Sequence, residues 1–265
     1  IKWNFPEVIA LPGENQVLKM LSYGTPVWIL TMEFKHGKDR VSTKEPHLSD
    51  YGALLTCELI SKKKPDLTAL HMVDLDEMRH HHGTNSKEAQ EAILRLDGRV
   101  KKIWEVLQST EGMENTVMCL VSDHGQEDVT RTVNLGEAIE HTEFKNLCSI
   151  QSNGMGAYVF FTEENAETRE RLAAWLKKNA EKLGISKVYG DADLRAMGAV
   201  KTVELAVEAA EGVVFSDGLP QAKREKGTHG FGPGRGAENC LFAVRGKNIK
   251  EGVWLPTMPM RDVAP

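Results

Sequence analysis

The sequence predicts an α/β protein of three layers, α/β/α, in which helices cover both faces of a mostly parallel central sheet and a small α/β subdomain is added. Two observations predict this class. Short apolar runs typical of buried strands alternate with longer segments whose apolar residues recur at three- and four-residue spacing. That alternation is expected where helices pack on a sheet. The length of 265 residues suits one large domain or a domain with a subdomain.

Five short runs are predicted to be strands because they are rich in apolar or β-branched residues. In chain order they are residues 26–34, 67–75, 116–123, 157–161 and 241–244. Amphipathic helices are predicted at residues 50–63, 87–108 and 167–183. Ser86 is placed to cap the second helix, and Gly184 to end the third. Ligands of open α/β sheets bind at the carboxyl ends of strands, so the polar residues that end the second and third runs mark the expected site.

Composition and charge exclude several classes of protein. The net charge of −5 gives no basic excess for binding a nucleic-acid polymer. No uninterrupted apolar stretch approaches the roughly 20 residues of a membrane-spanning helix, so we expect no membrane partner. Cys57, Cys119, Cys148 and Cys240 are scattered without CxxC spacing and are interpreted as reduced thiols, which favours a cytoplasmic location. Nothing in the sequence indicates an oligomeric state.

The stretch DLDEMRHHHGTNS, residues 74–86, concentrates side chains that bind metals. If the chain turns into a helix after the strand at 67–75, Asp76 and His80 are four residues apart and lie on one helix face. A carboxylate and an imidazole on one face supply half of a tetrahedral metal site. The alternative is a solvated surface patch, since acidic residues and histidines are mostly exposed. His81 and His82 point elsewhere on such a helix and are interpreted as bystanders.

Two further phrases place a histidine beside a glycine where a strand or loop should end. In VSDHGQ, Asp123 and His124 follow the apolar run TVMCLV, so a buried strand delivers two adjacent ligands to a loop. Gly125 lets the backbone turn away there. The alternative is an aspartate that caps the next helix beside an incidental histidine. In GTHGFGP, His229 lies among glycines, which allow close approach to an ion or phosphate, although this motif alone is common.

In order and separation, these three elements resemble the type I phosphodiesterase/nucleotide pyrophosphatase family of the alkaline phosphatase superfamily. DEMRHHHG resembles the D-x-x-x-H-x-x-G element of that family, SDHG its aspartate-histidine-glycine element, and GTHGFGP its final histidine element. The resemblance implies an alkaline phosphatase-like fold and two divalent metal ions, usually zinc in this family, with manganese as the alternative. Asp76, His80 and His229 would bind one ion, and Asp123 and His124 would bind the other.

The resemblance also implies a two-metal hydrolase of phosphate esters, acting on a small-molecule phosphate ester or nucleotide. In such an enzyme a Thr or Ser nucleophile attacks phosphorus, and water then releases the phospho-enzyme. Residues 1–129 and 227–265 would form the catalytic core. Residues 130–226 would form an inserted α/β subdomain that shapes which leaving group fits.

The chain departs from the family pattern in its first 66 residues. Family members carry a metal-ligating aspartate and the Thr or Ser nucleophile upstream of the D-x-x-x-H element, and nothing in this region looks like either. Thr43 and Ser49 sit too late and lack the expected setting. The chain also begins without Met, so we expect a fragment whose nucleophile lies upstream of Ile1 and which is inactive alone. Two alternatives stay open: a metal-dependent phosphomutase of the same superfamily, and a non-catalytic metal-binding remnant.

Overall fold

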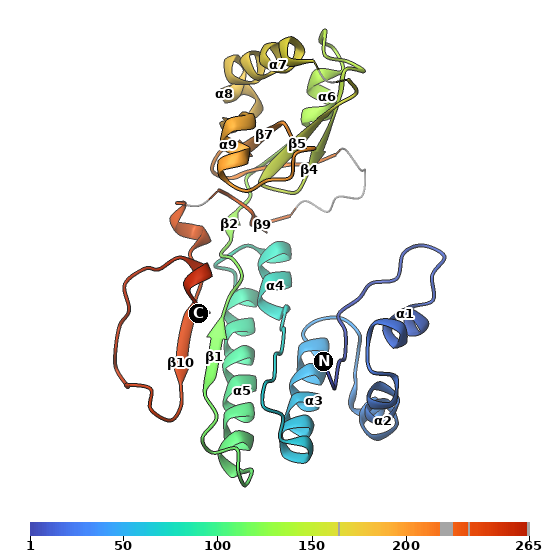
Figure 1. Ribbon diagram of the computed structural model, residues 1–265, viewed down its shortest axis with the longest axis vertical. Helices are drawn as coiled ribbons and strands as arrows, with labels where there is room; N and C mark the ends of the chain where they lie inside the picture. Colours follow the sequence, from blue (N-terminus) through green and yellow to red (C-terminus); the bar gives the residue numbers. More distant parts are fainter. Residues whose placement is uncertain (164, 218–224, 233, 264–265) are drawn as a thin grey trace. The chain divides into compact units, whose positions relative to one another are not determined.

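The computed structural model describes residues 1–163, 165–217, 225–232 and 234–263, which fall into two compact units. The first unit holds residues 1–74 and 95–114, and the second holds residues 75–94 and 115–265. Helix α5 (Lys87–Ser109) contributes to both units because the boundary falls inside it. Figure 1 shows the elements of each unit with the labels used below.

The first unit is helical, and its core lies between α2 and α3. Trp28 and Met32 of α2 pack against Tyr51 and Leu55 of α3, and all four side chains are buried. Besides part of α5, the unit contains α1 (Gln16–Tyr23), α2 (Pro26–His36), the 3-10 turn η1 (Gly37–Asp39) and α3 (His47–Lys63).

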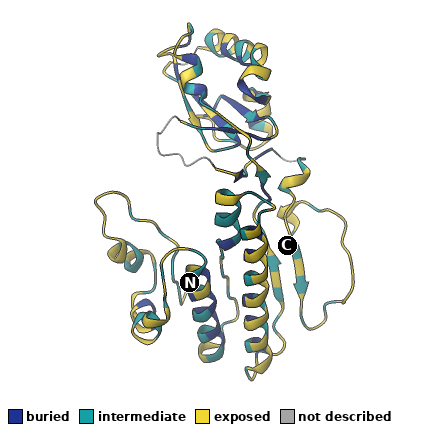
Figure 2. Cartoon of the chain, turned by 180° about the vertical axis from the view of Figure 1, so that it is seen from behind, coloured by how far each residue is buried: buried dark blue, intermediate teal, exposed yellow. Residues whose placement is uncertain are grey.

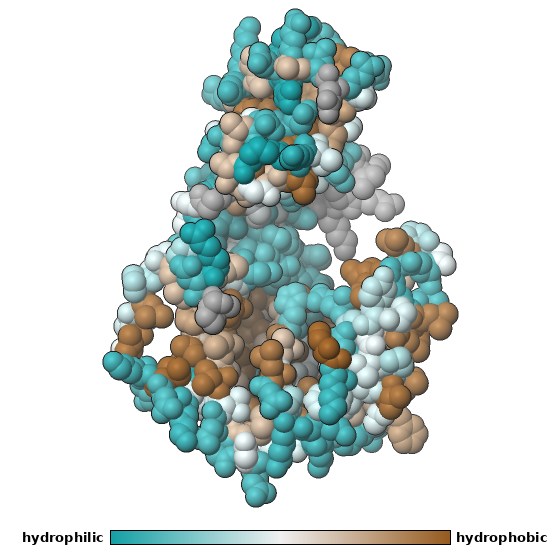
Figure 3. Space-filling view, in the orientation of Figure 1, coloured by the Kyte–Doolittle hydropathy of each residue, from teal (hydrophilic) through white to brown (hydrophobic). Residues whose placement is uncertain are grey.

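Residues 26–34 form a helix, so the strand predicted there is wrong. Thr25 is the N-cap residue and Pro26 lies in the first turn of α2, where proline loses no hydrogen bond and its fixed φ suits a helix. The buried residues of α2 are Trp28, Ile29 and Met32, which share one helix face. Apolar residues also occupy its exposed side, namely Val27, Leu30 and Phe34. Figure 3 shows apolar side chains on the surface over α1 and α2.

Residues 67–75 do not form the predicted strand either. Residues 67–73 have no regular secondary structure, and α4 (Asp74–His82) begins at Asp74. A strand exists only where its backbone pairs with a neighbour, and no ladder among the described residues includes this segment. The helix predicted after the run is confirmed, and it places Asp76 and His80 one turn apart.

All strands of the described part of the chain lie in the second unit. Its largest sheet is antiparallel and has four strands, in the order β4 (Cys148–Ser152), β5 (Gly156–Phe161), β7 (Leu205–Ala209) and β6 (Ile185–Tyr189). Two antiparallel pairs join β1 (Met118–Val121) to β10 (Phe242–Arg245) and β2 (Glu127–Asp128) to β9 (Gly227–Thr228). One parallel pair joins β3 (Arg131–Val133) to β8 (Val213–Phe215). The α/β class is confirmed, and within the described residues β3–β8 is its one parallel pairing.

The main core of the second unit lies between the four-stranded sheet and the helices beside it. Val159 and Leu205 from the sheet pack in one cluster with Leu172 and Leu176 of α7, all of them nearly inaccessible to solvent. Figure 2 shows buried residues along the strands of this sheet. The other helical elements of the unit are α6 (Leu135–Ile139), α7 (Ala166–Lys178), α8 (Ala180–Leu183), α9 (Asp191–Ala196), η2 (Gly236–Glu238) and η3 (Met260–Asp262).

Most other predicted elements are confirmed. The strands at 116–123, 157–161 and 241–244 are β1, β5 and β10, and the helices at 50–63 and 87–108 are α3 and α5. Ser86 Oγ accepts the backbone N–H of Ala89 at 3.1 Å, as an N-cap side chain does. The helix at 167–183 is divided at Asn179 into α7 and α8, and α8 ends at Gly184 as expected.

The four cysteines are free thiols, buried at Cys57 and Cys148 and exposed at Cys119 and Cys240. Across the residues described, no helix combines the length and the apolar character needed to cross a membrane. The cytoplasmic location stays a prediction.

We expect replacement of Gly184 by alanine to lower the free energy of unfolding of the second unit. Gly184 has φ of +65°, a left-handed conformation that costs an L-residue about 1–2 kcal/mol. An added Cβ would also lie 2.8 Å from Cγ1 of the buried Val213, and such overpacking costs a further ~1–3 kcal/mol. Urea unfolding followed by circular dichroism measures the change.

Gly198→Ala is the matched control, because Gly198 has a similar φ of +78° but open space around its Cβ position. It should show only the backbone cost. Equal losses in the two variants would mean that Val213 moves aside without cost.

Candidate metal centre

Helix α4 places Asp76 and His80 on one face, as the sequence predicts. His80 Nε2 lies 3.4 Å from Asp76 Oδ1. The hydrogen bond to Asp76 outweighs burial and raises the pKa of His80. For Asp76, burial raises the pKa, but the hydrogen bond from His80 and the neighbouring histidines outweigh it, so its pKa is lowered. The two side chains therefore form a tightly interacting pair.

His229 joins this pair from the segment that follows β9. Its Nε2 lies 3.7 Å from Asp76 Oδ1, and its ring centroid is 5.1 Å from that of His80. One ligand atom from each of Asp76, His80 and His229 lies within 4.8 Å of the others. Burial, and next the charge of His124, lower the pKa of His229, which favours the neutral imidazole that binds metals. We call these three residues the triad.

The backbone of β9 fixes the ring orientation of His80. His80 Nδ1 lies 2.8 Å from the carbonyl oxygen of Gly227. A carbonyl oxygen only accepts hydrogen bonds, so Nδ1 carries a proton and donates it there. Loss of the other ring proton therefore leaves the lone pair on Nε2, on the side of Asp76. Metal-binding histidines are commonly oriented by a hydrogen bond of this kind.

Asp123 and His124 lie directly beside the triad. They follow β1, and His124 Nε2 is 3.3 Å from Asp123 Oδ2. The His124 ring stacks on the His229 ring, with 3.5 Å between centroids and 10° between planes. His124 Nδ1 lies 3.0 Å from the Gly125 carbonyl oxygen and donates its proton there. The Nε2 atom of this ring therefore faces the Asp123 carboxylate, as Nε2 of His80 faces Asp76. The structure thus brings all five predicted ligand residues together.

The distances between these atoms are close to those between the ligands of a tetrahedral metal site, and the distance from Asp76 Oδ1 to His229 Nε2 is somewhat longer. Two ligand atoms bound at the usual ~2.0–2.2 Å to a tetrahedral zinc ion lie about 3.3–3.5 Å from each other. The carboxylate-to-imidazole distances are 3.4 and 3.7 Å in the triad and 3.3 Å between Asp123 and His124. Imidazole nitrogen and carboxylate oxygen are also ligands that zinc accepts. The triad therefore offers ligand atoms that lie close enough together to hold a metal ion.

The segment after His229 is anchored by contacts that sequence reasoning missed. Phe231 is 8% exposed and packs with Met155 and Val214. The Arg235 guanidinium lies 3.5 Å from the centroid of the Phe231 ring and pairs with the Glu127 carboxylate through Nε at 2.9 Å and Nη2 at 2.5 Å. These contacts join residues far apart in the sequence, and no local pattern indicates them.

A second contact that sequence reasoning missed involves Gln126, directly after the SDHG motif. Its side-chain Nε2 lies 2.9 Å from Asp76 Oδ1. Gly125 allows the close approach of another segment, since a Cβ at this position would lie 1.8 Å from the Ala237 carbonyl oxygen. Position next to the motif was the one signal available for Gln126.

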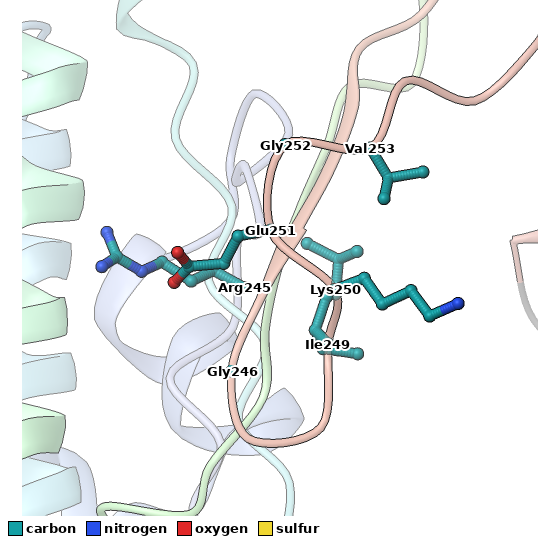
Figure 4. A pocket seen from close by; sticks show the side chains of 8 residues that line it. Arg245, Gly246, Ile249, Lys250, Glu251, Gly252 and Val253 are labelled. Carbon is teal, nitrogen blue, oxygen red and sulfur yellow. The ribbon is translucent and has the colours of Figure 1, made fainter.

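Neither of two cavities in the second unit is lined by a residue of the triad. A cavity of about 330 Å³ lies against β10 and the following loop, lined by residues 244–246 and 249–253. Figure 4 shows the Arg245 and Glu251 side chains on one side of that loop and Lys250 on the other. Among the described residues, the triad is the one group of three or more potential ligands spaced closely enough for a metal ion. The candidate site is therefore placed at the triad and its neighbours.

Comparison with known proteins gives a family. Residues 14–231 match the profile of the family described as type I phosphodiesterase/nucleotide pyrophosphatase. The match contains all five predicted metal ligands, from Asp76 to His229. No curated protein matches the sequence.

Comparison with solved structures gives the fold. Human and murine ectonucleotide pyrophosphatase/phosphodiesterase 5 are similar, with TM-scores of 0.60 and 0.59 and sequence identities of 18% and 16%. An inactive variant of the murine protein in complex with AMP also matches, with a TM-score of 0.59 and 16% identity. Each comparison covers 75% of this chain and 52% of the solved chain. The chain therefore spans about half the length of these proteins and shares their fold.

Proposed function

The chain belongs to the type I phosphodiesterase/nucleotide pyrophosphatase family, and from this membership we propose that it carries the metal-binding residues of a two-metal hydrolase of phosphate esters. One observation carries the proposal: Asp76, His80 and His229, far apart in the sequence, present ligand atoms within 4.8 Å of one another. The stacking of His124 on His229 supports a second ion at Asp123 and His124.

We propose zinc as the metal, with manganese as the alternative. Two divalent ions held side by side lower the pKa of a hydroxyl nucleophile and stabilise negative charge on the leaving oxygen. The triad supplies three ligands, whereas Asp123 and His124 supply two. The triad should therefore bind its ion more firmly.

The side chains of this chain bind and orient in this proposal, and none of them acts as a general base. His80 is suited to binding a metal ion because the Gly227 carbonyl oxygen accepts its Nδ1–H, which leaves Nε2 for the ion. His229 is suited to binding a metal ion because its lowered pKa favours the neutral ring. The nucleophile stays a prediction: a Thr or Ser upstream of Ile1.

We propose a nucleotide or another small phosphate ester as the substrate. The family description and the AMP complex of the murine relative support this class. Residues 130–226 would form the inserted subdomain that selects the leaving group, and residues 1–129 and 227–265 would belong to the catalytic core. Phe231, two residues after His229, packs with Met155 and Val214 of residues 130–226. This packing supports a place for the proposed subdomain beside the proposed metal ligands.

The test compares the 265-residue chain with a longer chain that includes the upstream segment. The longer chain should hydrolyse the activated diester bis-nitrophenyl phosphate faster than the monoester nitrophenyl phosphate. A chelator should abolish the activity and zinc should restore it, while the shorter chain should stay inactive. In the longer chain, His124→Ala should lower kcat more than it changes KM, because this ligand serves the transition state rather than binding.

Each outcome distinguishes the alternatives left open by the sequence. Zinc binding without turnover in either length would support a metal-binding remnant. Phosphoryl transfer within a sugar phosphate, without release of phosphate, would support a phosphomutase. Equal activity of the two lengths would place the nucleophile inside the 265 residues and contradict the proposal.

A further inference from the structure

Gln126 joins the two segments that carry the proposed metal ligands. It follows Asp123, His124 and Gly125 in the chain, yet its side chain reaches helix α4. Its Nε2 lies 2.9 Å from Asp76 Oδ1 and 3.4 Å from the Asp76 backbone carbonyl oxygen. Gln126 is 8% exposed and the Asp76 side chain is 36% exposed, so these hydrogen bonds are partly buried.

The orientation of this amide follows from its neighbours. A carboxylate and a backbone carbonyl only accept hydrogen bonds, and both lie against the same end of Gln126. The reverse orientation would bring the amide oxygen against two acceptor oxygens, which repel it. The NH₂ group therefore faces Asp76.

The contacted atom is also the one that faces the histidines. Asp76 Oδ1 is the oxygen 3.4 Å from His80 Nε2 and 3.7 Å from His229 Nε2. An ionised carboxylate oxygen has lone pairs for more than one partner, so it can accept the Gln126 hydrogen bond and still bind an ion. A donor at this place fixes the rotation of the carboxylate, as outer partners of metal ligands do.

We infer that Gln126 is a positioning residue that holds Asp76 Oδ1 in the direction of the triad and ties it to the Asp123–His124 loop. The inference rests on the proposed metal site and deepens it. Its consequence is mechanical coupling: ordering of the Asp123–His124 loop also orders Asp76. Loss of an outer partner of this kind lowers metal affinity by about 10–100-fold.

The experiment replaces Gln126 by methionine, which keeps the length of the side chain and removes its hydrogen-bond donor. Zinc affinity, measured by competition with a chromophoric chelator, should fall about 10–100-fold. The visible spectrum of bound Co²⁺, which reports ligand geometry, should also change. Gln126→Asn is a polar variant that retracts the amide by one methylene, and it should show the same loss of affinity. It keeps the test decisive if the methionine variant folds poorly.

Gln90→Met is the matched control, because Gln90 is exposed and its amide donates to the Asn85 backbone carbonyl at 3.2 Å. It should leave zinc affinity and the Co²⁺ spectrum unchanged. The melting temperature of every variant is measured in the presence of chelator. If Gln126 had a purely structural role, its replacement would lower the melting temperature without changing the zinc affinity.

The outcomes separate this inference from the proposed function. If the natural chain binds neither zinc nor manganese, the metal site itself is wrong. If the natural chain binds zinc and both Gln126 variants bind it equally well with an unchanged Co²⁺ spectrum, Gln126 has no positioning role and the metal site stands.

Discussion

Replacement of His80 by alanine is expected to lower the zinc affinity of the chain by more than about 100-fold, the upper end of what loss of an outer partner costs. His80 supplies one of the three ligand atoms of the triad. Its removal leaves two ligands, the Asp76 carboxylate and the His229 imidazole. That is the same number that Asp123 and His124 supply. The measurement is zinc titration by calorimetry, with a competing chelator for the natural chain.

Two neighbouring histidines provide controls for this prediction. His81 and His82 lie on the same helix, are exposed, and lie outside the triad. Alanine at either position keeps the helix and removes an imidazole from the same turn. Both variants should bind zinc as the natural chain does. If His80→Ala also leaves tight binding unchanged, or if His81→Ala removes it, the ligand assignment is wrong.

The proximity of the candidate ligands could be predicted largely because most of them are marked by local sequence. Asp76 and His80 are one helical turn apart, so their proximity follows from the helix alone. Asp123 and His124 are adjacent and follow a strand that the structure confirms as β1. His229 depends on long-range contacts and was placed by the order of the family's motifs.

The contacts that support the site were not predictable. Gln126 reaches Asp76 across 50 residues of sequence, and Arg235 reaches Glu127 across 108. Neither residue belongs to a periodic pattern, because its role depends on where another segment passes. Contacts of this kind appear only once the chain is folded.

The errors in the fold also have physical causes. The run at 26–34 is apolar on several sides, so its composition fits a strand as well as a helix, and Thr25 followed by Pro26 was the signal that favoured a helix. The run at 67–75 is apolar enough for a strand, but a strand requires a pairing partner as well as composition. Apolar composition alone therefore does not predict which backbone groups find a pairing partner.

Replacement of Asp74 by alanine is expected to lower the free energy of unfolding of the first unit by about 3–5 kcal/mol. Asp74 is 0% exposed, and its carboxylate pairs with two arginines of α5. Arg95 donates to it through Nε at 2.9 Å and Nη2 at 2.7 Å, and Arg99 through Nη1 at 2.6 Å. Removal of the carboxylate would leave both guanidinium groups without this partner, and Arg99 is itself buried.

The pH dependence of the same variant tests the electrostatic part of this cost. Burial raises the pKa of Asp74, but the hydrogen bonds from Arg95 and Arg99 outweigh it, so the pKa lies below its ordinary value. A lowered carboxyl pKa contributes stability above the unfolded-state value of about 3.9 and loses it as the pH falls through the folded-state value. The stability difference between the natural chain and Asp74→Ala should therefore be full near neutral pH and shrink below about pH 4.

Urea unfolding at several pH values measures this difference, and hydrogen exchange of the α3 amides assigns it to the first unit. Asp97→Ala is the control, because Asp97 is an exposed carboxylate between the same two arginines on α5. Surface changes of that kind stay within about 0.5 kcal/mol. A cost at Asp74 no larger than at Asp97, or one that does not change with pH, would mean that the buried carboxylate contributes little beyond its volume. A cost confined to higher pH would instead show that the ion pairs with Arg95 and Arg99 hold this part of the first unit together.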